Sequence, residues 1–400
     1  MAAFARVLLA WELGHGLGHV LPLRVVADQL IQAGHQVFVA GRDLLRTRRA
    51  FDGSAARVLA APFFPGLVIP PQQQNSLADV IWFDGGGHSA QSTEALFFAW
   101  RELLVQLRID LVIADAAPMA IAAAHGVTRR LSYDNCFHAT DVNAWSIFRD
   151  WERIDANATQ ERVRRLLLHL NGARCAVNLP PADCLSTGFA AQRQLLRFLP
   201  ELDHAGPRAH SRYMGQIPGP GLSPHWPESN VSRRVLAYVR KEHPLSDRVI
   251  HGLARLSDTA VLCFHDGIAA DKLRLASHIS YSQAPYALAE VLPQADAVVC
   301  NGGGLHSMAT QFGVPTLVLP MHTEQFLAGR MGVEAGVSLM HVARGDRPDL
   351  LPMIKSVLNQ TDMKTRAQAI ADKHQAREPD PMAAVLEEIN QLLDGPVASW

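Results

Sequence analysis

The sequence predicts an α/β protein with two facing Rossmann-like domains, each a doubly wound parallel sheet, and with a cleft between the domains. Short apolar strands alternate with helix-length amphipathic segments in both halves of the chain, and this order favours parallel strands covered by helices. A stretch rich in glycine and proline interrupts the alternation between the halves. The 400 residues also exceed the roughly 250 to 300 that one hydrophobic core usually serves.

The amino-terminal half opens with a strand, a helix and a second strand. We expect Pro22 to lie in the first turn of the helix, a position that suits proline, and Gly34 to end the helix. A further amphipathic helix leads into a strand that ends at Asp115. The expected elements of this half are strands at 5–11, 37–40 and 111–114 and helices at 23–31 and 96–107.

The segment 203–232 carries the strongest linker signal, because the helical pattern stops there and glycine and proline crowd together. Beyond it, strands are expected at 235–239, 260–264, 279–281, 297–300 and 316–319. We therefore divide the chain into a domain at 1–215, a linker at 216–232, a domain at 233–375 and a closing helical segment at 376–400. The halves share a structural unit but no sequence repeat, which argues against a solenoid.

Charge and composition exclude several classes of protein. The 37 basic and 38 acidic residues give a net charge of −1, so neither nucleic acid nor an anionic membrane is an expected partner. The five cysteines are odd in number and show no CxxC spacing, which indicates reduced thiols. No apolar run approaches the roughly 18 residues of a membrane span, and Glu12 interrupts the apolar start. We expect a cytoplasmic protein.

The first strand runs into a glycine-rich loop. Gly14, Gly16 and Gly18 precede His19, and the spacing GxGxG is a near miss of the dinucleotide fingerprint GxGxxG. An imidazole at the carboxyl edge of a parallel sheet is well placed for proton transfer, and Asp115 ends another strand at the same edge. A surface histidine and a helix-capping aspartate are the alternatives, because spacing alone cannot join the two residues.

The fourth strand of the second half also runs into glycines. Gly302, Gly303 and Gly304 follow Asn301 and open a helix, whose unpaired N–H groups suit a phosphate. The loop lacks the GK[ST] motif of a P-loop nucleoside triphosphatase. After the next strand, the segment MHTEQ places His322, Glu324 and Gln325 at the same edge. A carboxylate beside an amide suits sugar hydroxyls, and solvated residues at a helix start are the equal alternative.

These loops together resemble the GT-B glycosyltransferases of the UDP-glycosyltransferase superfamily, in particular the bacterial natural-product enzymes. The segment GHVLPLRVVADQLIQAGHQV at 18–37 is similar to the family's GHxxPxxxLAxxLxxxGHxV, and NGGGLHS, MATQFGVPTLVLP and MHTEQ are similar to its donor motif. The resemblance implies that His19 is the catalytic base and that Asp115 orients it. It also implies an amino-terminal acceptor domain, a carboxyl-terminal nucleotide-sugar domain, and a final helix that packs back on the amino-terminal domain.

The resemblance assigns the nucleotide-sugar donor to the second half. The residues it implies are Ala284, Asn301, Gly302, Gly303, Gly304, His306, Ser307, Glu324 and Gln325. The chain departs from the family pattern at three positions: Asn301 replaces the phosphate-binding histidine, and Leu305 and His306 replace small and hydroxyl residues. His306, one turn into the helix, is a candidate to restore the lost imidazole.

The resemblance implies a metal-independent inverting transfer from a UDP- or dTDP-sugar to a hydroxyl of a small, apolar acceptor, with no cofactor. The chain contains no DxD triplet, the signature of the metal-dependent GT-A fold. Segments 62–90 and 138–152 and the residues Gly16, Gly18, Trp145, Phe148 and Trp151 are candidates for the acceptor side. A silent nucleotide-sugar-binding homologue, a nucleotide-sugar 2-epimerase and an NAD oxidoreductase remain the alternatives, and a homodimer stays open.

Overall fold

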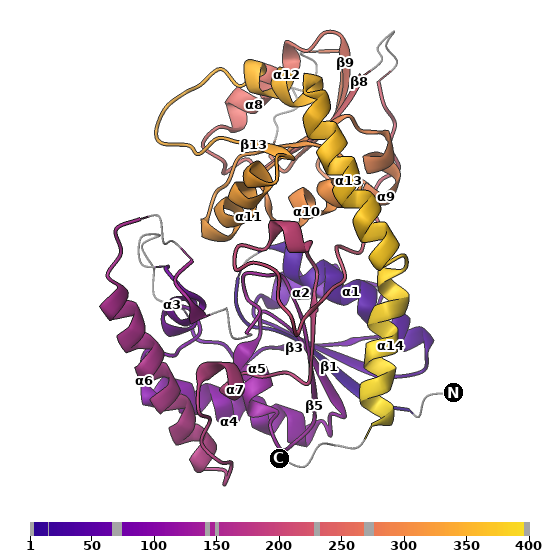
Figure 1. Ribbon diagram of the computed structural model, residues 1–400. Helices are drawn as coiled ribbons and strands as arrows, with labels where there is room; N and C mark the ends of the chain where they lie inside the picture. Colours follow the sequence, from indigo (N-terminus) through magenta and orange to yellow (C-terminus); the bar gives the residue numbers. More distant parts are fainter. Residues whose placement is uncertain are drawn as a thin grey trace. The chain divides into compact units, whose positions relative to one another are not determined.

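The structure is a computed structural model that describes residues 4–14, 16–65, 74–140, 145–148, 152–227, 233–267 and 276–395. The chain divides into two compact units (Figure 1). The first comprises Met1–Arg197, Pro207–Met214 and Asp380–Trp400, and the second Phe198–Gly206 and Gly215–Pro379. Parts of the predicted segments lie outside the described residues: 66–73, 141–144 and 149–151, which includes Trp151, on the acceptor side, 228–232 of the linker and 396–400 of the closing segment.

The first unit is built on a parallel sheet in the order β3-β2-β1-β4-β5-β6-β7. Its strands are β1 (Arg6–Trp11), β2 (Gln36–Gly41), β3 (Arg57–Ala60), β4 (Leu111–Asp115), β5 (Arg129–Asp134), β6 (Arg193–Leu196) and β7 (Arg212–Tyr213). Its helices are α1 (Leu17–Gln32), α2 (Leu44–Ala50), α3 (Leu77–Phe83), α4 (Ala90–Gln106), α5 (Pro118–Ala123), α6 (Ala156–Cys175), α7 (Leu185–Gly188) and α14 (Pro381–Asp394). The last helix, α14, contacts β5.

The strand order of the first unit reverses between β1 and β4. The chain proceeds outward from β1 to β3 and then returns to place β4 on the other side of β1. Ligands of doubly wound sheets bind at such a switch point, beyond the carboxyl ends of the strands. The loop after β1 and the residues after β4 therefore occupy the expected ligand-binding edge.

The start of α1 differs from the sequence prediction. The helix begins at Leu17, with Gly16 as its N-cap, and Pro22 lies inside it instead of in its first turn. Proline has no N–H, so the helix loses the bond that residue 22 would donate to the carbonyl of Gly18. Because the helix starts early, His19 belongs to its first turn and is buried.

The second unit repeats the architecture with the order β10-β9-β8-β11-β12-β13, and its switch point lies between β8 and β11. Its strands are β8 (Arg233–Val239), β9 (Thr259–His265), β10 (Ile279–Ser282), β11 (Ala297–Cys300), β12 (Thr316–Val318) and β13 (Ser338–Met340). Its helices are α8 (Ser246–Ala254), α9 (Leu288–Val291), α10 (Gly303–Gln311), α11 (Thr323–Glu334), α12 (Leu351–Asn359) and α13 (Thr361–Arg377), with short 3₁₀ turns η3 (Pro200–Leu202) and η5 (Leu292–Gln294).

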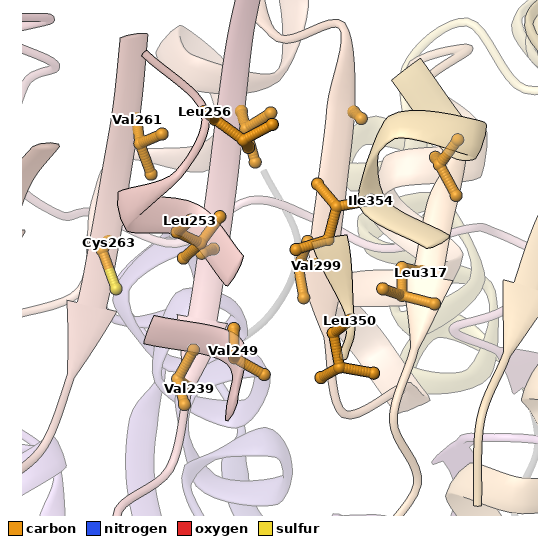
Figure 2. Packing of buried hydrophobic residues seen from close by; sticks show 14 of the residues in the cluster. Val239, Val249, Leu253, Leu256, Val261, Cys263, Val299, Leu317, Leu350 and Ile354 are labelled. Atoms are coloured by element: carbon orange, nitrogen blue, oxygen red, sulfur yellow. The ribbon is translucent and has the colours of Figure 1, made fainter. Parts of the chain in front are cut away.

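One face of this second sheet is covered by α8 and α12. Figure 2 shows Leu253 of α8 and Ile354 of α12 packed over strand residues such as Val261 and Val299. These strands are buried on both faces, which explains why they appear in the sequence as continuous apolar runs. The prediction of two doubly wound parallel sheets is confirmed.

Candidate functional site

His19 and Asp115 meet at the switch point of the first sheet. Nδ1 of His19 lies 2.9 Å from Oδ1 of Asp115, and both side chains are buried. When the carboxylate is ionised it only accepts hydrogen bonds, so Nδ1 then carries the proton of this bond and Nε2 is the ring nitrogen that can act as an acceptor. This is the arrangement of a general base held in one tautomer by a carboxylate.

The His19 ring is held by aromatic neighbours and faces a glycine. It stacks on Trp11, with ring centroids 5.8 Å apart and planes 14° apart, and meets His138 edge-on at 5.3 Å. Gly14 has φ +76°, and a Cβ there would lie closer than 3.0 Å to Nε2 of His19. Any side chain at position 14 would therefore press on Nε2 of the His19 ring.

A buried arginine binds the other oxygen of Asp115. Arg197 donates from Nη2 to Oδ2 of Asp115 and from Nε, at 3.2 Å, to the carbonyl of Tyr133. Burial raises the pKa of Asp115 to about 7, and the Arg197 guanidinium opposes this rise. Asp115 thus joins a histidine on one oxygen to a permanent cation on the other.

Two more buried carboxyl groups lie at this edge of the sheet. Asp134 accepts hydrogen bonds from the backbone N–H of Ala116 and, at 2.6 Å, from the hydroxyl of Ser132. Glu12 caps the start of α5 by accepting from two backbone N–H groups, at 3.0 and 2.5 Å. Burial raises the pKa of Asp134 to about 7 and that of Glu12 to about 8. Both groups anchor the loops around Asp115 through backbone N–H groups.

In the second unit, the glycine loop after β11 forms the start of α10. Gly302 is the N-cap with φ +107°, a conformation that a side chain strongly disfavours. A Cβ at Gly302 would also lie 3.1 Å from the carbonyl oxygen of Gln325 and 3.2 Å from Cγ1 of Val318. The first N–H groups of α10 are thereby presented at the carboxyl edge of the sheet, beside the positive end of the helix dipole.

The first turn of α11 packs against this loop. Glu324 and Gln325 lie in that turn, and Gln325 borders the backbone of Gly302. Oε1 of Gln325 accepts a hydrogen bond of 2.9 Å from the backbone N–H of Met321, which fixes the turn between β12 and α11. The structure thus brings Gln325 against the glycine loop, and the family resemblance implies one ligand, the nucleotide-sugar donor, for both.

Asn301 joins two strand ends. Its Nδ2 donates a hydrogen bond of 3.1 Å to the carbonyl of Leu319, just beyond β12. Nε2 of His243 donates to the same carbonyl at 3.0 Å, because Nδ1 of His243 already accepts from the backbone N–H of Leu245. One N–H of the Asn301 amide is therefore committed to the scaffold of the loop.

The structure places His306 and Ser307 inside the unit instead of at the phosphate loop. His306 is fully buried, and its Nδ1 lies 3.0 Å from the hydroxyl of Thr316 on β12. Its Nε2 lies beside Gly332 of α11 and Ser338 of β13. Burial lowers the pKa of His306 to about 4, so the ring is neutral. The expectation that His306 restores an imidazole at the helix start is not met, because the fourth residue of α10 faces the sheet.

The remaining donor-side candidates differ in their surroundings. Ala284 is exposed in the loop after β10, where its N–H and carbonyl both bond the hydroxyl of Ser282, at 3.0 and 2.7 Å. Gln216, which sequence reasoning did not select, lies against Gly304, with its Nε2 3.5 Å from the position of a Cβ there. Gln216 is tied to Gln311 of α10 by two backbone-to-side-chain hydrogen bonds, of 2.8 and 3.1 Å.

The structure also shows the contacts of the acceptor-side candidates in the first unit. Gly16 caps α1, and Gly18 accepts a hydrogen bond on its carbonyl from Nη1 of Arg197 at 3.2 Å. Trp145 stacks on the buried ring of Phe189, with centroids 5.7 Å apart. Phe148 packs against Phe137 at 5.4 Å. Trp145 and Phe148 therefore contribute to packing inside the unit.

The sequence analysis did not single out Arg197 or Trp11 beside the His19 pair, and it included His138 only as the first residue of the acceptor-side segment 138–152. His138 and Trp11 carry no motif, and a histidine or tryptophan among apolar residues usually indicates packing. Arg197 left one signal, a charge inside the apolar run LLRFL. A buried arginine needs acceptors, so that interruption was a reason to expect a partner such as Asp115.

Comparison with known proteins identifies the fold. No protein-family model and no curated sequence matches the chain. The solved structure of CalG4, the calicheamicin glycosyltransferase, is similar with a TM-score of 0.71 and 18% identity over 99% of this chain and 100% of that one. The glycotransferase of kitacinnamycin is similar with a TM-score of 0.69 and 17% identity, over 98% and 100%.

A third similar structure is the spinosyn rhamnosyltransferase SpnG complexed with thymidine diphosphate. Its TM-score is 0.67 at 18% identity, over 96% of this chain and 100% of that one. The predicted GT-B fold is confirmed, because these glycosyltransferases match the chain over nearly its whole length. Within the described part of the chain, no helix combines the length and the apolar composition that crossing a membrane requires.

Proposed function

We propose that this chain is a glycosyltransferase that moves a sugar from a UDP- or dTDP-sugar to a hydroxyl of a small, apolar acceptor. The observation that carries the proposal is the buried His19–Asp115 pair at the switch point of the first sheet, 2.9 Å apart, with Nε2 of His19 facing a glycine. A pair of this geometry suits a general base. The GT-B fold, which the chain shares with solved glycosyltransferase structures such as that of CalG4, supports sugar transfer as the reaction.

The first unit supplies the base in this proposal. The acceptor hydroxyl donates to Nε2 of His19, and its oxygen forms a bond to the anomeric carbon while the bond from that carbon to the phosphate oxygen breaks. The proton moves to Nε2, and Asp115 stabilises the imidazolium through Nδ1. Attack from the face opposite the leaving group inverts the anomeric configuration. The nucleoside diphosphate leaves with the electron pair of the broken bond.

The second unit supplies the donor site. The N–H groups at the start of α10 face the position where negative charge develops on the leaving diphosphate, so fixed dipoles stabilise it without a metal ion. Glu324 and Gln325, in the first turn of α11, hold the sugar hydroxyls, and Gln325 borders Gly302. The absence of a DxD triplet from the sequence supports the metal-independent form of the reaction.

The choice of donor and acceptor class rests on the similar structures. One is SpnG complexed with thymidine diphosphate, another is VinC in complex with DTDP, and a third is SpnG complexed with spinosyn aglycone. Exposed apolar side chains after β1 and β3 support an apolar acceptor: Leu17 is 40% exposed and Phe63 is 42% exposed. Such side chains are suited to contact a ligand with few polar groups.

The test is transfer from dTDP- and UDP-hexoses to a panel of apolar, hydroxylated acceptors, followed by chromatography and mass spectrometry. We expect His19→Ala to lower kcat at least about a hundredfold while calorimetry shows unchanged binding of dTDP or UDP. His35→Ala is the matched control, because His35 is a buried histidine of the same unit at the opposite end of α1. Full activity of His19→Ala contradicts the proposal.

The donor half has its own test. A Cβ at Gly302 strains the loop by about 1 to 3 kcal/mol, so Gly302→Ala is expected to weaken dTDP or UDP binding about tenfold with His19 untouched. Nucleotide binding without transfer to any acceptor identifies the silent homologue, which the inward His306 and the committed amide of Asn301 favour. Release of nucleoside diphosphate without an acceptor indicates the epimerase.

A further inference from the structure

Arg197 connects three segments that surround His19. It follows β6, is 2% exposed, and continues the ladder with β5 through its backbone N–H, which donates to the carbonyl of Asp134 at 2.8 Å. Its guanidinium lies 5.1 Å from the ring centre of Tyr133 and donates to the carboxylate of Asp115 and to the carbonyls of Tyr133 and Gly18. The planar fork of an arginine can serve several acceptors in fixed directions.

The contact with Gly18 has a cause in the sequence. Pro22 has no N–H, so the Gly18 carbonyl has no donor four residues along α1. Nη1 of Arg197 lies 3.2 Å from that carbonyl and replaces the missing bond. Gly18 directly precedes His19, so Arg197 holds both the backbone that carries His19 and the carboxylate that binds its ring.

We propose that Arg197 is a positioning residue for the His19–Asp115 pair, which fixes the pair's geometry and whose charge keeps the pair ready to accept a proton. The inference rests on the proposed function for its link to turnover. The electrostatic effect of Arg197 on the pair involves residues of the first unit alone. It is therefore expected even if the chain transfers a group other than a sugar.

The sign of the electrostatic effect follows from charge alone. Taking up a proton makes the His19–Asp115 pair more positive, and a guanidinium bonded to Asp115 opposes that change. Arg197 therefore lowers the apparent pKa of the pair, whichever of its two residues holds the extra proton. A general base must be unprotonated to act, so the enzyme stays active to lower pH with Arg197 than without it.

Other titratable groups lie at this edge of the sheet, and the test must leave them unchanged. Asp134 and Tyr133 lie on β5, Glu12 follows β1, and His138 meets the His19 ring. Arg42, which follows β2, acts on Glu12 and is itself bonded to Asp84, at 2.7 Å. All of them persist when position 197 alone is substituted.

The experiment compares the pH dependence of kcat/KM in the full-length enzyme and its variants. For Arg197→Met we expect the acid limb to move up by about one to two pH units, with kcat at the optimum lower by about ten- to a hundredfold. Arg197→Lys keeps the positive charge but lacks the several N–H donors of the planar guanidinium. The acid limb of its kcat/KM profile should therefore stay near that of the unsubstituted enzyme, while kcat falls. Arg162→Met is the matched control, since it removes another arginine bonded to a buried aspartate, Asp79, in the same unit.

A second readout separates this inference from the proposed function. Titration of the His19 imidazole by NMR, its signal assigned by its loss in His19→Gln, should show a higher apparent pKa in Arg197→Met and no change in Arg162→Met, even if no sugar transfer is found. An unchanged acid limb and an unchanged His19 titration in folded Arg197→Met or Arg197→Gln overturn the electrostatic part. Arg197→Lys with unaltered kcat overturns the positioning part, and this variant decides the question if the uncharged variants do not fold.

Discussion

Gly14 offers the most direct test of the space beside His19. In Gly14→Ala, the new Cβ lies closer than 3.0 Å to Nε2 and 3.1 Å from Cε1 of His19. The ring cannot yield easily, because Nδ1 is bonded to Asp115 at 2.9 Å and one face stacks on Trp11. In the proposed mechanism the acceptor hydroxyl binds at Nε2, so the methyl group would also compete with that hydroxyl for space.

The expected magnitude has two parts. The positive φ of +76° is unfavourable for alanine by about 1 to 2 kcal/mol, which lowers the free energy of unfolding. Relieving the contact requires a displacement of about 1 Å, and a misplacement of that size costs about a hundredfold in rate. We therefore expect kcat/KM to fall at least about a hundredfold, with a modest loss of stability.

The assay pairs Gly14→Ala with Gly34→Ala. Gly34 ends α1 with φ +89°, and nothing lies within 4 Å of a Cβ built there, so this variant carries the backbone strain without the contact. Urea unfolding should show a loss of stability in both variants, larger in Gly14→Ala because of the contact with the His19 ring, whereas only Gly14→Ala should lose transfer activity. A Gly14→Ala enzyme with kcat/KM within about threefold of the parent would refute the reasoning, because it would show that Nε2 does not need this space.

Two further predictions concern the interior of the second unit. In Gly332→Ala, the Cβ lies 2.6 Å from Cε1 of His306 and also presses on Ser338, so overpacking of about 1 to 3 kcal/mol should outweigh the roughly 1 kcal/mol that alanine gains in a helix. Urea unfolding checks this, and a stability equal to the parent's contradicts it. Burial lowers the pKa of His306 to about 4 from an ordinary 6.5, so its contribution to stability is complete above pH 6.5 and is lost as the pH falls toward 4, by up to about 1.4 kcal/mol per pH unit. His306→Gln should unfold with a correspondingly smaller dependence on pH, and an unchanged slope would count against a neutral buried ring.

Strands that are apolar throughout were predictable from the sequence. The expected strand at 297–300 coincides with β11, and the one at 111–114 differs from β4 by one residue. The strands β5 and β6 escaped prediction, because RRLSYD and RQLL begin with charged residues. Arg130 of β5 is nevertheless buried, with its Nε bonded to the carbonyl of Ala190. Arg130 can be buried because the carbonyl of Ala190, distant in sequence, accepts a hydrogen bond from it. A local sequence pattern does not indicate such a distant acceptor.

The candidate site likewise has features that the sequence predicts and features that it does not. Position relative to a strand end was enough to select His19, Asp115 and the glycine loop, because parallel strands deliver their carboxyl ends to one edge. The direction of each side chain was not predictable. His306 follows the glycines closely in sequence, yet the turn of the helix carries it inward to Thr316. Arg197 is distant from His19 in sequence and joins its partner only through the fold.

Packing also limits which groups the glycine loop before α10 can offer to a ligand. The neutral amide of Asn301 holds two strand ends together through the carbonyl of Leu319, and the buried ring of His306 lies in the interior, so neither side chain brings a charge to the start of α10. A diphosphate bound there would be met by backbone N–H groups and the helix dipole. These groups do not titrate near neutral pH, so their share of the binding energy follows only the ionisation of the ligand. A protein that binds an anion in this way needs no excess of basic residues, and the chain has none, with 37 basic residues against 38 acidic ones.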